Sequence, residues 1–128
     1  MRILLVLCAA IVGATLLSGC VATNVPPPDR RVTLSPDLGT SVYVTDIRCT
    51  KGKSDYYTFQ ANVVNNTSSD YAVEWKVVWL DADGVTIASA VSTWSARMLQ
   101  PFEVCALKGT APSPAAADMM FYVRKARR

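Results

Sequence analysis

The stretch Tyr71-Ala-Val-Glu-Trp-Lys-Val-Val-Trp-Leu80 decides the fold of this chain. Large apolar side chains occupy every second position: Val73, Trp75, Val77 and Trp79. The polar residues Glu74 and Lys76 lie between them, which gives an extended strand one apolar and one polar face. A helix would also align the two tryptophans, because they are four positions apart. The three valines and the turn residues Asp81-Ala-Asp-Gly84 favour a strand that ends in a hairpin.

Short segments with the same two-residue period recur on both sides of this stretch. Residues 56–65 alternate between apolar and polar side chains, and they end in the turn cluster Asn65–Asp70. β-branched and aromatic residues predict further strands at 40–48, 85–91, 102–107 and 119–125. Six or seven short strands separated by turns predict an all-β domain over residues 39–128, an immunoglobulin-like antiparallel β-sandwich.

The three tryptophans are interpreted as filling between the two sheets, since each can bury more than about 150 Å². Trp94 is expected in a strand or in a bend at a sheet edge. An exposed aromatic platform for a ligand is the alternative use of these residues. Ser113, Pro114 and the alanines that follow predict a single helical turn, with serine as the cap and proline at the first helical position.

The first twenty residues resemble a bacterial lipoprotein signal. Arg2 precedes an apolar run, residues 3–17, that is shorter than the roughly 20 residues of a membrane span. The run ends in Leu17-Ser18-Gly19-Cys20, which resembles the lipobox, where a peptidase cuts before a lipid-modified cysteine. We expect residues 1–19 to be a cleaved signal peptide and Cys20 to carry lipid. The alternatives are a soluble signal, or an uncleaved anchor in which Cys20 is an ordinary thiol.

Lipidation implies that the mature chain is held at a membrane. Two or three acyl chains anchor a protein essentially permanently, at about 0.8 kcal/mol per buried methylene. Val21 follows the cysteine instead of an aspartate, and this favours the outer membrane, with the domain facing the periplasm. Residues 20–38 contain Pro26-Pro27-Pro28 and predict an extended tether. A ligand for a proline-binding partner is the alternative reading of these prolines.

Four cysteines occur, and two of them remain after Cys8 leaves with the signal peptide and Cys20 takes lipid. Cys49 and Cys105 form an even pair in a compartment where disulfides persist. A bridge between them would stabilise the domain by about 4 kcal/mol on the chain-entropy model. Two unpaired thiols are the alternative. A metal site is not expected, because the chain has no histidine to complete the ligand set.

Composition argues against several classes of function. The formal net charge of +3 is too small to indicate a nucleic-acid partner, and it falls by one when Arg2 leaves with the signal peptide. The absence of histidine removes the commonest general base. Asp81 and Asp83 are expected to shape a turn, and the hydroxyls beside Trp94 have no base to activate them. We therefore expect no enzyme, no catalytic residue, no cofactor and no small-molecule substrate.

Three parts of the chain carry a family resemblance. They are Glu74–Gly84 with Trp94, then Leu107-Lys-Gly-Thr-Ala-Pro112, then Phe121-Tyr-Val-Arg124. Together with the lipobox, these segments resemble the YcfL family of small bacterial lipoproteins. The resemblance implies an immunoglobulin-like sandwich and a location in the cell envelope, and it implies no catalytic or binding residues. This chain has Trp79-Leu-Asp81 where Trp-Phe-Asp or Trp-Tyr-Asp is common in that family.

The sequence therefore predicts a non-enzymatic envelope protein that binds another protein or the peptidoglycan layer. An accessory lipoprotein of a secretion or surface-assembly complex is the alternative function. The basic cluster Arg124-Lys-Ala-Arg-Arg128 can contact anionic lipid, at about 1 kcal/mol per charge, or can remain solvated.

Overall fold

The computed structural model describes residues 29–88 and 92–128. Eight elements follow in chain order: β1 (Val32–Leu34), η1 (Pro36–Leu38, a 3₁₀ turn), β2 (Val42–Lys51), β3 (Tyr57–Asn65), β4 (Tyr71–Leu80), β5 (Ser95–Leu99), β6 (Val104–Thr110) and β7 (Asp118–Lys125). The lipobox, Cys20 and the prolines at 26–28 lie outside the described residues. Within the described residues, no helix is long and apolar enough to cross a membrane.

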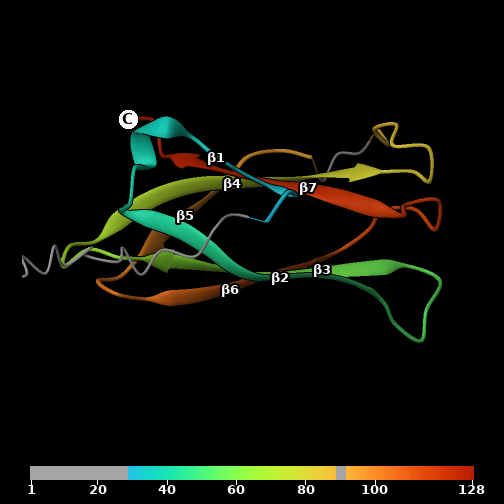
Figure 1. Ribbon diagram of the computed structural model, residues 1–128, viewed down its shortest axis with the longest axis horizontal. Helices are drawn as coiled ribbons and strands as arrows, with labels where there is room; N and C mark the ends of the chain where they lie inside the picture. Colours follow the sequence, from blue (N-terminus) through green and yellow to red (C-terminus); the bar gives the residue numbers. More distant parts are fainter. Residues whose placement is uncertain (1–28, 89–91) are drawn as a thin grey trace, which may run out of the picture.

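The strands form two sheets that lie one above the other (Figure 1). One sheet has the order β1-β7-β4-β5 and the other the order β2-β3-β6. All neighbours are antiparallel except β1 and β7, which run parallel. The chain crosses between the sheets so that β3 pairs with β6 and β4 pairs with β7. This crossing pattern is the Greek key of immunoglobulin-like sandwiches, so the predicted fold class is confirmed.

The core lies between the inner faces of β3, β4 and β7. As predicted, alternate residues of β3 and β4 point inward, and Trp79 is only 1% exposed. Phe59 packs edge-on against Trp79, with ring centroids 6.1 Å apart, and also contacts Trp75 and Phe121. Aromatic pairs at such distances add about 0.5–1.5 kcal/mol each beyond the area that they bury. Two of the three tryptophans therefore fill the space between the sheets, as expected.

One end of the sandwich is closed by Asn65, a buried polar residue. Its side-chain amide donates hydrogen bonds to the carbonyls of Ser69 and Gln100, each at 2.8 Å. Its carbonyl oxygen accepts from both the backbone N–H and the hydroxyl of Thr67. The predicted turn at 65–70 is therefore present, and its asparagine also ties β3 to the chain that leaves β5.

The folded domain begins earlier than the sequence predicts. Residues 29–38 were expected in the tether that ends at 38, but β1 pairs with β7 and η1 packs onto the core. Leu38 is 1% exposed. The sequence signal is weak because β1 has only three residues, too few to show a period. The predicted boundary at residue 39 is therefore wrong, and β1 and η1 belong to the sandwich.

Three smaller predictions also need correction. The strand expected over 85–91 is reduced, in its described part, to a bridge between Leu80 and Thr86. The strand expected from Phe102 begins at Val104, because Phe102 has a φ of 55° in the turn after Pro101. The helical turn expected after Ser113 is instead a hydrogen-bonded turn without a helix, in which Ala116 N–H donates to Ser113 O and the serine hydroxyl accepts from Ala115 N–H as a cap would.

Candidate binding site

In the part of the chain that the structure describes, the side of the sandwich between β5 and β6 is less covered than the side between β1 and β2, and we call it the open side. β5 pairs with β4 only from Tyr71 to Trp75. At the far end of β4, Leu80 bridges to Thr86, and Trp79 O accepts from Ile87 N–H. Between these two pairings, β4 has no partner on that side among the described residues. The inner face of this segment carries Val77, between Trp75 and Trp79.

A cavity of about 170 Å³ lies at this interruption. Its walls are aromatic and apolar, from Phe59, Trp75, Val77 and Trp79, and its rim is polar: Thr93, Ser95, Lys108 and Thr110. An apolar cavity of about 150 Å³ is large enough to hold a benzene-sized group. An apolar pocket with a few polar groups at its mouth is the usual form of a binding site. The cavity is therefore suited to one apolar or aromatic group that enters from the open side.

Gly109 on β6 makes room for the ring that forms one wall of this cavity. A Cβ atom at position 109 would lie 2.5 Å from Cε1 of Phe59, far inside van der Waals contact. Gly109 lies directly opposite Phe59 in the ladder between β6 and β3. Because glycine has no side chain, the ring lies against the backbone of β6. The position of Phe59, and with it the shape of the cavity, depends on this glycine.

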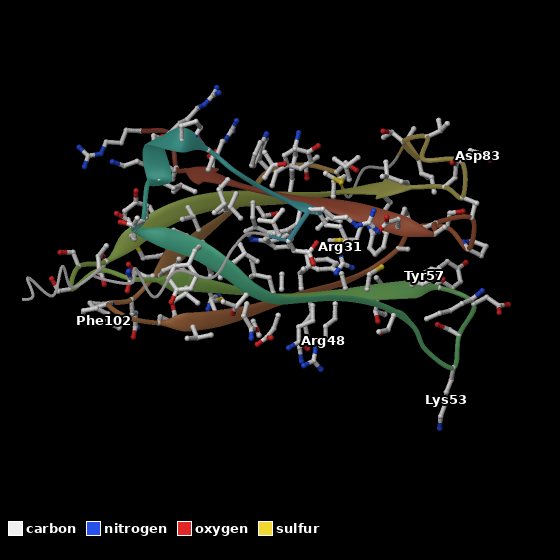
Figure 2. All side chains as sticks on the ribbon, in the orientation of Figure 1. Arg31, Arg48, Lys53, Tyr57, Asp83 and Phe102 are labelled. Carbon is white, nitrogen blue, oxygen red and sulfur yellow. The ribbon has the colours of Figure 1, made fainter. Side chains whose placement is uncertain are left out.

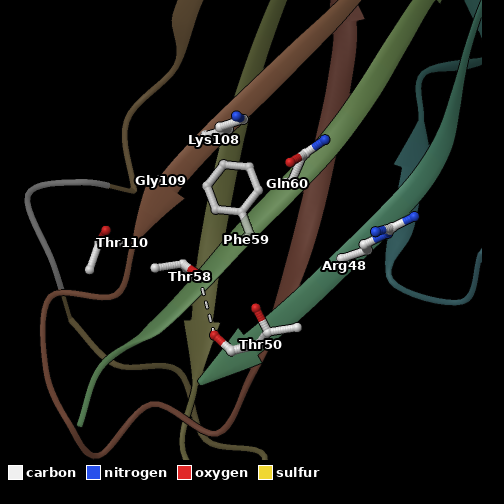
Figure 3. A pocket seen from close by; sticks show the side chains of 8 residues that line it. All are labelled: Arg48, Thr50, Thr58, Phe59, Gln60, Lys108, Gly109 and Thr110. Carbon is white, nitrogen blue, oxygen red and sulfur yellow. Dashed lines mark hydrogen bonds between the residues drawn. The ribbon is translucent and has the colours of Figure 1, made fainter. Parts of the chain in front are cut away.

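A second, shallower hollow of about 570 Å³ lies beside the same glycine (Figure 3). Two rows that run across the three-stranded sheet line it: Arg48-Gln60-Lys108 and Thr50-Thr58-Thr110. Figure 2 shows Arg48 pointing away from the sandwich. The hydroxyl of Thr58 donates to Thr50 O at 3.3 Å, which joins β3 to β2. The hollow is polar and carries two cations, so it is suited to polar or anionic groups.

Trp94 fixes the chain that leads into β5. Its ring lies on the outer face of the four-stranded sheet, 3.8 Å from the Arg124 guanidinium carbon and 4.8 Å from Lys76 Nζ. Arg124 also donates from Nε to Glu74 Oε2 at 2.6 Å. Since side chains alternate along an extended chain, Thr93 and Ser95 then face the cavity. The sequence suggested that Trp94 fills the space between the sheets, and this prediction is wrong. Trp94 lies outside the core and holds the rim of the cavity in place.

The opposite side of the sandwich is closed. Arg31 lies between the two layers (Figure 2) and donates from Nη2 to Ile47 O on β2 at 3.2 Å, while its own carbonyl accepts from Phe121 N–H on β7. Asp29 accepts two side-chain hydrogen bonds from Arg31. These bonds hold the pKa of Asp29 below its ordinary value, and they raise the pKa of Arg31. The first residues of the domain therefore bridge both sheets.

The structure contradicts the predicted disulfide. Cys49 on β2 lies opposite Phe59, whereas Cys105 on β6 lies opposite Val63, and β3 separates the two strands. Two strand spacings and four residues along the strand put the cysteines about 16 Å apart, far beyond the 7 Å limit for a bridge. Both are free thiols, and burial raises the pKa of Cys49. The even cysteine count was misleading because pairing depends on register, which the sequence does not show.

The other predicted positions have simpler roles. Asp81 accepts hydrogen bonds from the backbone N–H groups of Asp83 and Val85, each at 2.9 Å, so the aspartates shape the turn as expected. Among residues 29–88 and 92–128, no group of three or more cysteine, aspartate or glutamate side chains could hold a metal ion. Leu17, Ser18, Gly19 and Cys20 are not described, so the lipidation site remains a prediction.

Comparison with known proteins agrees with this architecture. The family described as "Protein of unknown function (DUF1425)" matches residues 29–125. The chain belongs to the DUF1425 family. No curated protein matches it.

Two solved structures share the fold of this DUF1425 domain. One is the crystal structure of Campylobacter jejuni cj0090, with 21% identity and a TM-score of 0.66, covering 77% of this chain and all of that one. The other is a DUF1425 family member from Shewanella sp. pv-4, with 18% identity and a TM-score of 0.62, covering 68% of this chain and 80% of that one. The family match begins at Asp29 and so includes β1 and η1, in agreement with their place in the sandwich.

Sequence reasoning missed several of the residues that line this candidate site. Gly109 and Lys108 were noticed only as part of a family-like segment, and Thr93 and Ser95 only as hydroxyls without a base. One signal was available: Gly109 interrupts an otherwise regular strand, which often marks a place where another group approaches the backbone. That the approaching group is Phe59 could not be known without the register of β3 and β6.

Proposed function

We propose that this protein is a lipid-anchored, non-enzymatic binding module of the cell envelope, and that it captures its partner on the open side of the sandwich. The partner is a protein or a peptidoglycan strand. The single observation that carries the proposal is the aromatic-walled cavity of about 170 Å³ between the sheets, with its polar rim. Apolar walls with a few polar groups at the mouth are the usual form of a binding site, which supports this assignment.

The location is proposed from the sequence. The lipobox Leu17–Cys20 supports an outer-membrane lipoprotein that faces the periplasm, and the YcfL-like features support the same compartment. Because the family match starts at Asp29, the chain between Cys20 and the matched domain is nine residue steps long. Fully extended, nine steps span at most about 32 Å. The domain would therefore capture partners close to the membrane surface and would not reach far across the periplasm.

Binding is tested by a pair of neighbouring substitutions on β5. Ser95→Phe places a ring at the mouth of the cavity, whereas Ala96→Phe places the same ring on the outer face of the sheet. The full chain, extracted from membranes in mild detergent, is exposed to envelope extract and to purified cell-wall sacculi. We expect Ser95→Phe to lower capture of the partner at least tenfold and Ala96→Phe to leave it within twofold. Equal capture by both variants would contradict the proposal.

Anchoring is tested separately at Cys20. Cys20→Ser removes the thiol that accepts lipid, so the chain is expected to leave the membrane fraction on washing with salt. Intact-mass measurement of the wild-type protein is expected to show a diacylglyceryl group and acyl chains on Cys20. An unmodified Cys20 in the wild-type protein would refute the anchor but would leave the result at Ser95 standing.

A further inference from the structure

Among the residues that the structure describes, β6 pairs on one side only and has a free edge, and its register shows which backbone groups point outward. Asn65 N–H donates to Glu103 O, and Ala111 N–H donates to Tyr57 O, so the odd-numbered residues of β6 pair with β3. Hydrogen-bonded pairs alternate along an antiparallel ladder. The N–H and C=O groups that face away from β3 are therefore those of Val104, Ala106, Lys108 and Thr110. None of them takes part in a hydrogen bond among the described residues.

The edge of β2, on the other side of the same sheet, is protected. A bulge interrupts its pairing between Thr45 and Arg48, with Asp46 at a φ of 50°. Arg31 covers the Ile47 carbonyl next to this bulge. Bulges and covering side chains are how proteins prevent another strand from pairing with an edge. β6 has neither device: its pairing with β3 is regular over seven residues, and Val104 is 61% exposed.

The free edge of β6 lies between the two hollows that meet at Gly109. On the inner side of the sheet, residues 108–110 line the aromatic cavity, and on the outer side, Lys108 and Thr110 line the polar hollow. A strand added to this edge would alternate its side chains between the two sides. A side chain opposite Gly109 would point to the cavity, and its neighbour opposite Lys108 would point to the cationic hollow.

We propose that β6 binds an extended peptide segment of a partner protein by strand addition. This inference rests on the proposed function and names the class of partner for the same site. The peptide carries an apolar or aromatic side chain that fills the cavity. It carries an acidic side chain at the adjacent position, next to Lys108. Main-chain hydrogen bonds supply affinity in this mode of recognition, and the alternating side chains supply specificity.

A second copy of the chain does not fit the same site through its own β6. The side chains of β6 that would point to the cavity are those of Cys105 and Leu107, and both are buried in their own core. Position 109 has no side chain to offer. A glycan strand lacks the regularly spaced amide donors that would pair with the free edge. The site is therefore complementary to a polypeptide whose apolar side chains are not already buried.

The test uses a labelled ten-residue peptide in which valine alternates with threonine, with one phenylalanine in the valine register and an aspartate beside it. Its affinity for the detergent-extracted full chain is measured by fluorescence anisotropy. Methylation of the amide nitrogens that face β6 removes the main-chain donors and leaves every side chain in place. We expect at least tenfold weaker binding after this methylation, and at least tenfold weaker binding when alanine replaces the phenylalanine.

On the protein, Ala106→Pro removes an outward-facing N–H. Since this group does not pair with β3, proline at this position of an edge strand is compatible with the fold. Ala106→Thr is the matched control with its N–H intact. We expect the proline variant to bind the peptide at least tenfold more weakly and the threonine variant to bind within twofold of wild type. Thermal unfolding of both variants shows whether the sandwich is intact. Lys108→Glu is a second test of peptide binding, and it leaves the backbone unchanged.

The outcomes separate this inference from the proposed function. Loss of binding on methylation and in Ala106→Pro, with at least threefold weaker binding in Lys108→Glu, supports strand addition. Binding that survives methylation and Ala106→Pro, but is lost in Ser95→Phe, refutes strand addition and leaves the cavity as a binding site. No binding of the peptide, while Ser95→Phe still abolishes capture from the envelope extract, also refutes this inference and leaves the proposed function standing.

Discussion

The two long sides of this sandwich, the closed side between β1 and β2 and the open side between β5 and β6, differ in how the space between the sheets is covered. On one side, β1 extends the four-stranded sheet, and η1 carries the chain directly into β2, so that Leu38 and Arg31 fill the gap. On the other side, β5 begins only opposite Trp75, and a cavity lies next to this point. Each side has a short strand at the edge of the four-stranded sheet, β1 or β5, so strand length alone does not decide whether a side is closed.

The difference lies in what covers the edges. On the closed side, an arginine and a bulge occupy the β2 edge, and a buried leucine completes the core. On the open side, the regular edge of β6 and the aromatic wall are left without a partner in the described chain. We infer that the closed side serves stability and the open side serves binding, and the following five predictions test that division.

The largest effect is expected at Leu38, on the closed side. Leu38→Ala removes a side chain that is almost fully buried, so it should lower the free energy of unfolding by about 2–5 kcal/mol. Val85→Ala, at a position that is 60% exposed, is the control and should change it by less than about 0.5 kcal/mol. Urea denaturation measures both. Equal stability of the two variants would mean that η1 behaves as tether.

The next effect is expected at the glycine that shapes the cavity. Gly109→Ala places a methyl group 2.5 Å from Phe59 and should cost about 1–3 kcal/mol through overpacking. It should also weaken peptide binding, because the displaced ring moves into the cavity. Gly52→Ala is the matched control, since no atom lies within 4 Å of the added carbon. A Gly109→Ala variant with wild-type stability and binding would show that Phe59 does not define the site.

A smaller loss is expected when the rim of the cavity is loosened. Trp94→Ala removes the contacts with Arg124 and Lys76, each worth about 0.5–1 kcal/mol, so unfolding should become easier by about 1–2 kcal/mol. Peptide affinity should fall with it, because Thr93 and Ser95 lose their support. Phe102→Ala removes an aromatic side chain that is 64% exposed and is expected to change neither quantity. Calorimetry and anisotropy give the two measurements.

A still smaller, pH-dependent effect is expected at Asp29. Its pKa is lower in the folded chain than in the unfolded chain, because Arg31 bonds the carboxylate. The stability that this carboxylate contributes is therefore fully present above pH about 4 and is lost as the pH falls through the lower, folded-state pKa. Since both side chains are partly exposed, the contribution is at most about 1 kcal/mol.

Asp29→Asn isolates this contribution. The variant should be slightly less stable than wild type at pH 7, and the gap should narrow at acid pH, as the pH falls through the lowered folded-state pKa of the wild-type carboxylate. Urea midpoints at the two pH values provide the comparison. A gap that stays constant with pH would show that the carboxylate charge is not what holds Arg31.

No effect is expected from reducing agents. Cys49 lies on the edge strand of the closed side and Cys105 on the edge strand of the open side, so a bridge would tie the two sides together across β3. Because the cysteines are free, urea midpoints with and without dithiothreitol should agree. Alkylation of the unfolded, unreduced mature chain should label both thiols. A reductant-dependent loss of about 4 kcal/mol would show that the bridge exists and would require a different register.

Several elements of the fold could be predicted from local pattern. β3 and β4 were located to within one residue because each has a continuous two-residue period on a half-buried face. The turns at Asn65 and Asp81 were evident from residues whose side chains bond the nearby backbone. β1 and β5 were missed or misplaced because they are short, and because neighbouring strands, more than their own composition, make them strands.

The sequence by itself determined the class of the fold and the inward residues of the two central strands, since each depends on side chains close together along the chain. It also predicts the lipid anchor, from a pattern that is equally local. Only the tertiary structure decided which strands became edges, that Cys49 and Cys105 lie apart, that Trp94 lies outside the core, and that Gly109 meets Phe59 beside a cavity. The physical reason is that these features depend on register between distant segments. A shift of one residue in pairing would have reversed which side chains face the core.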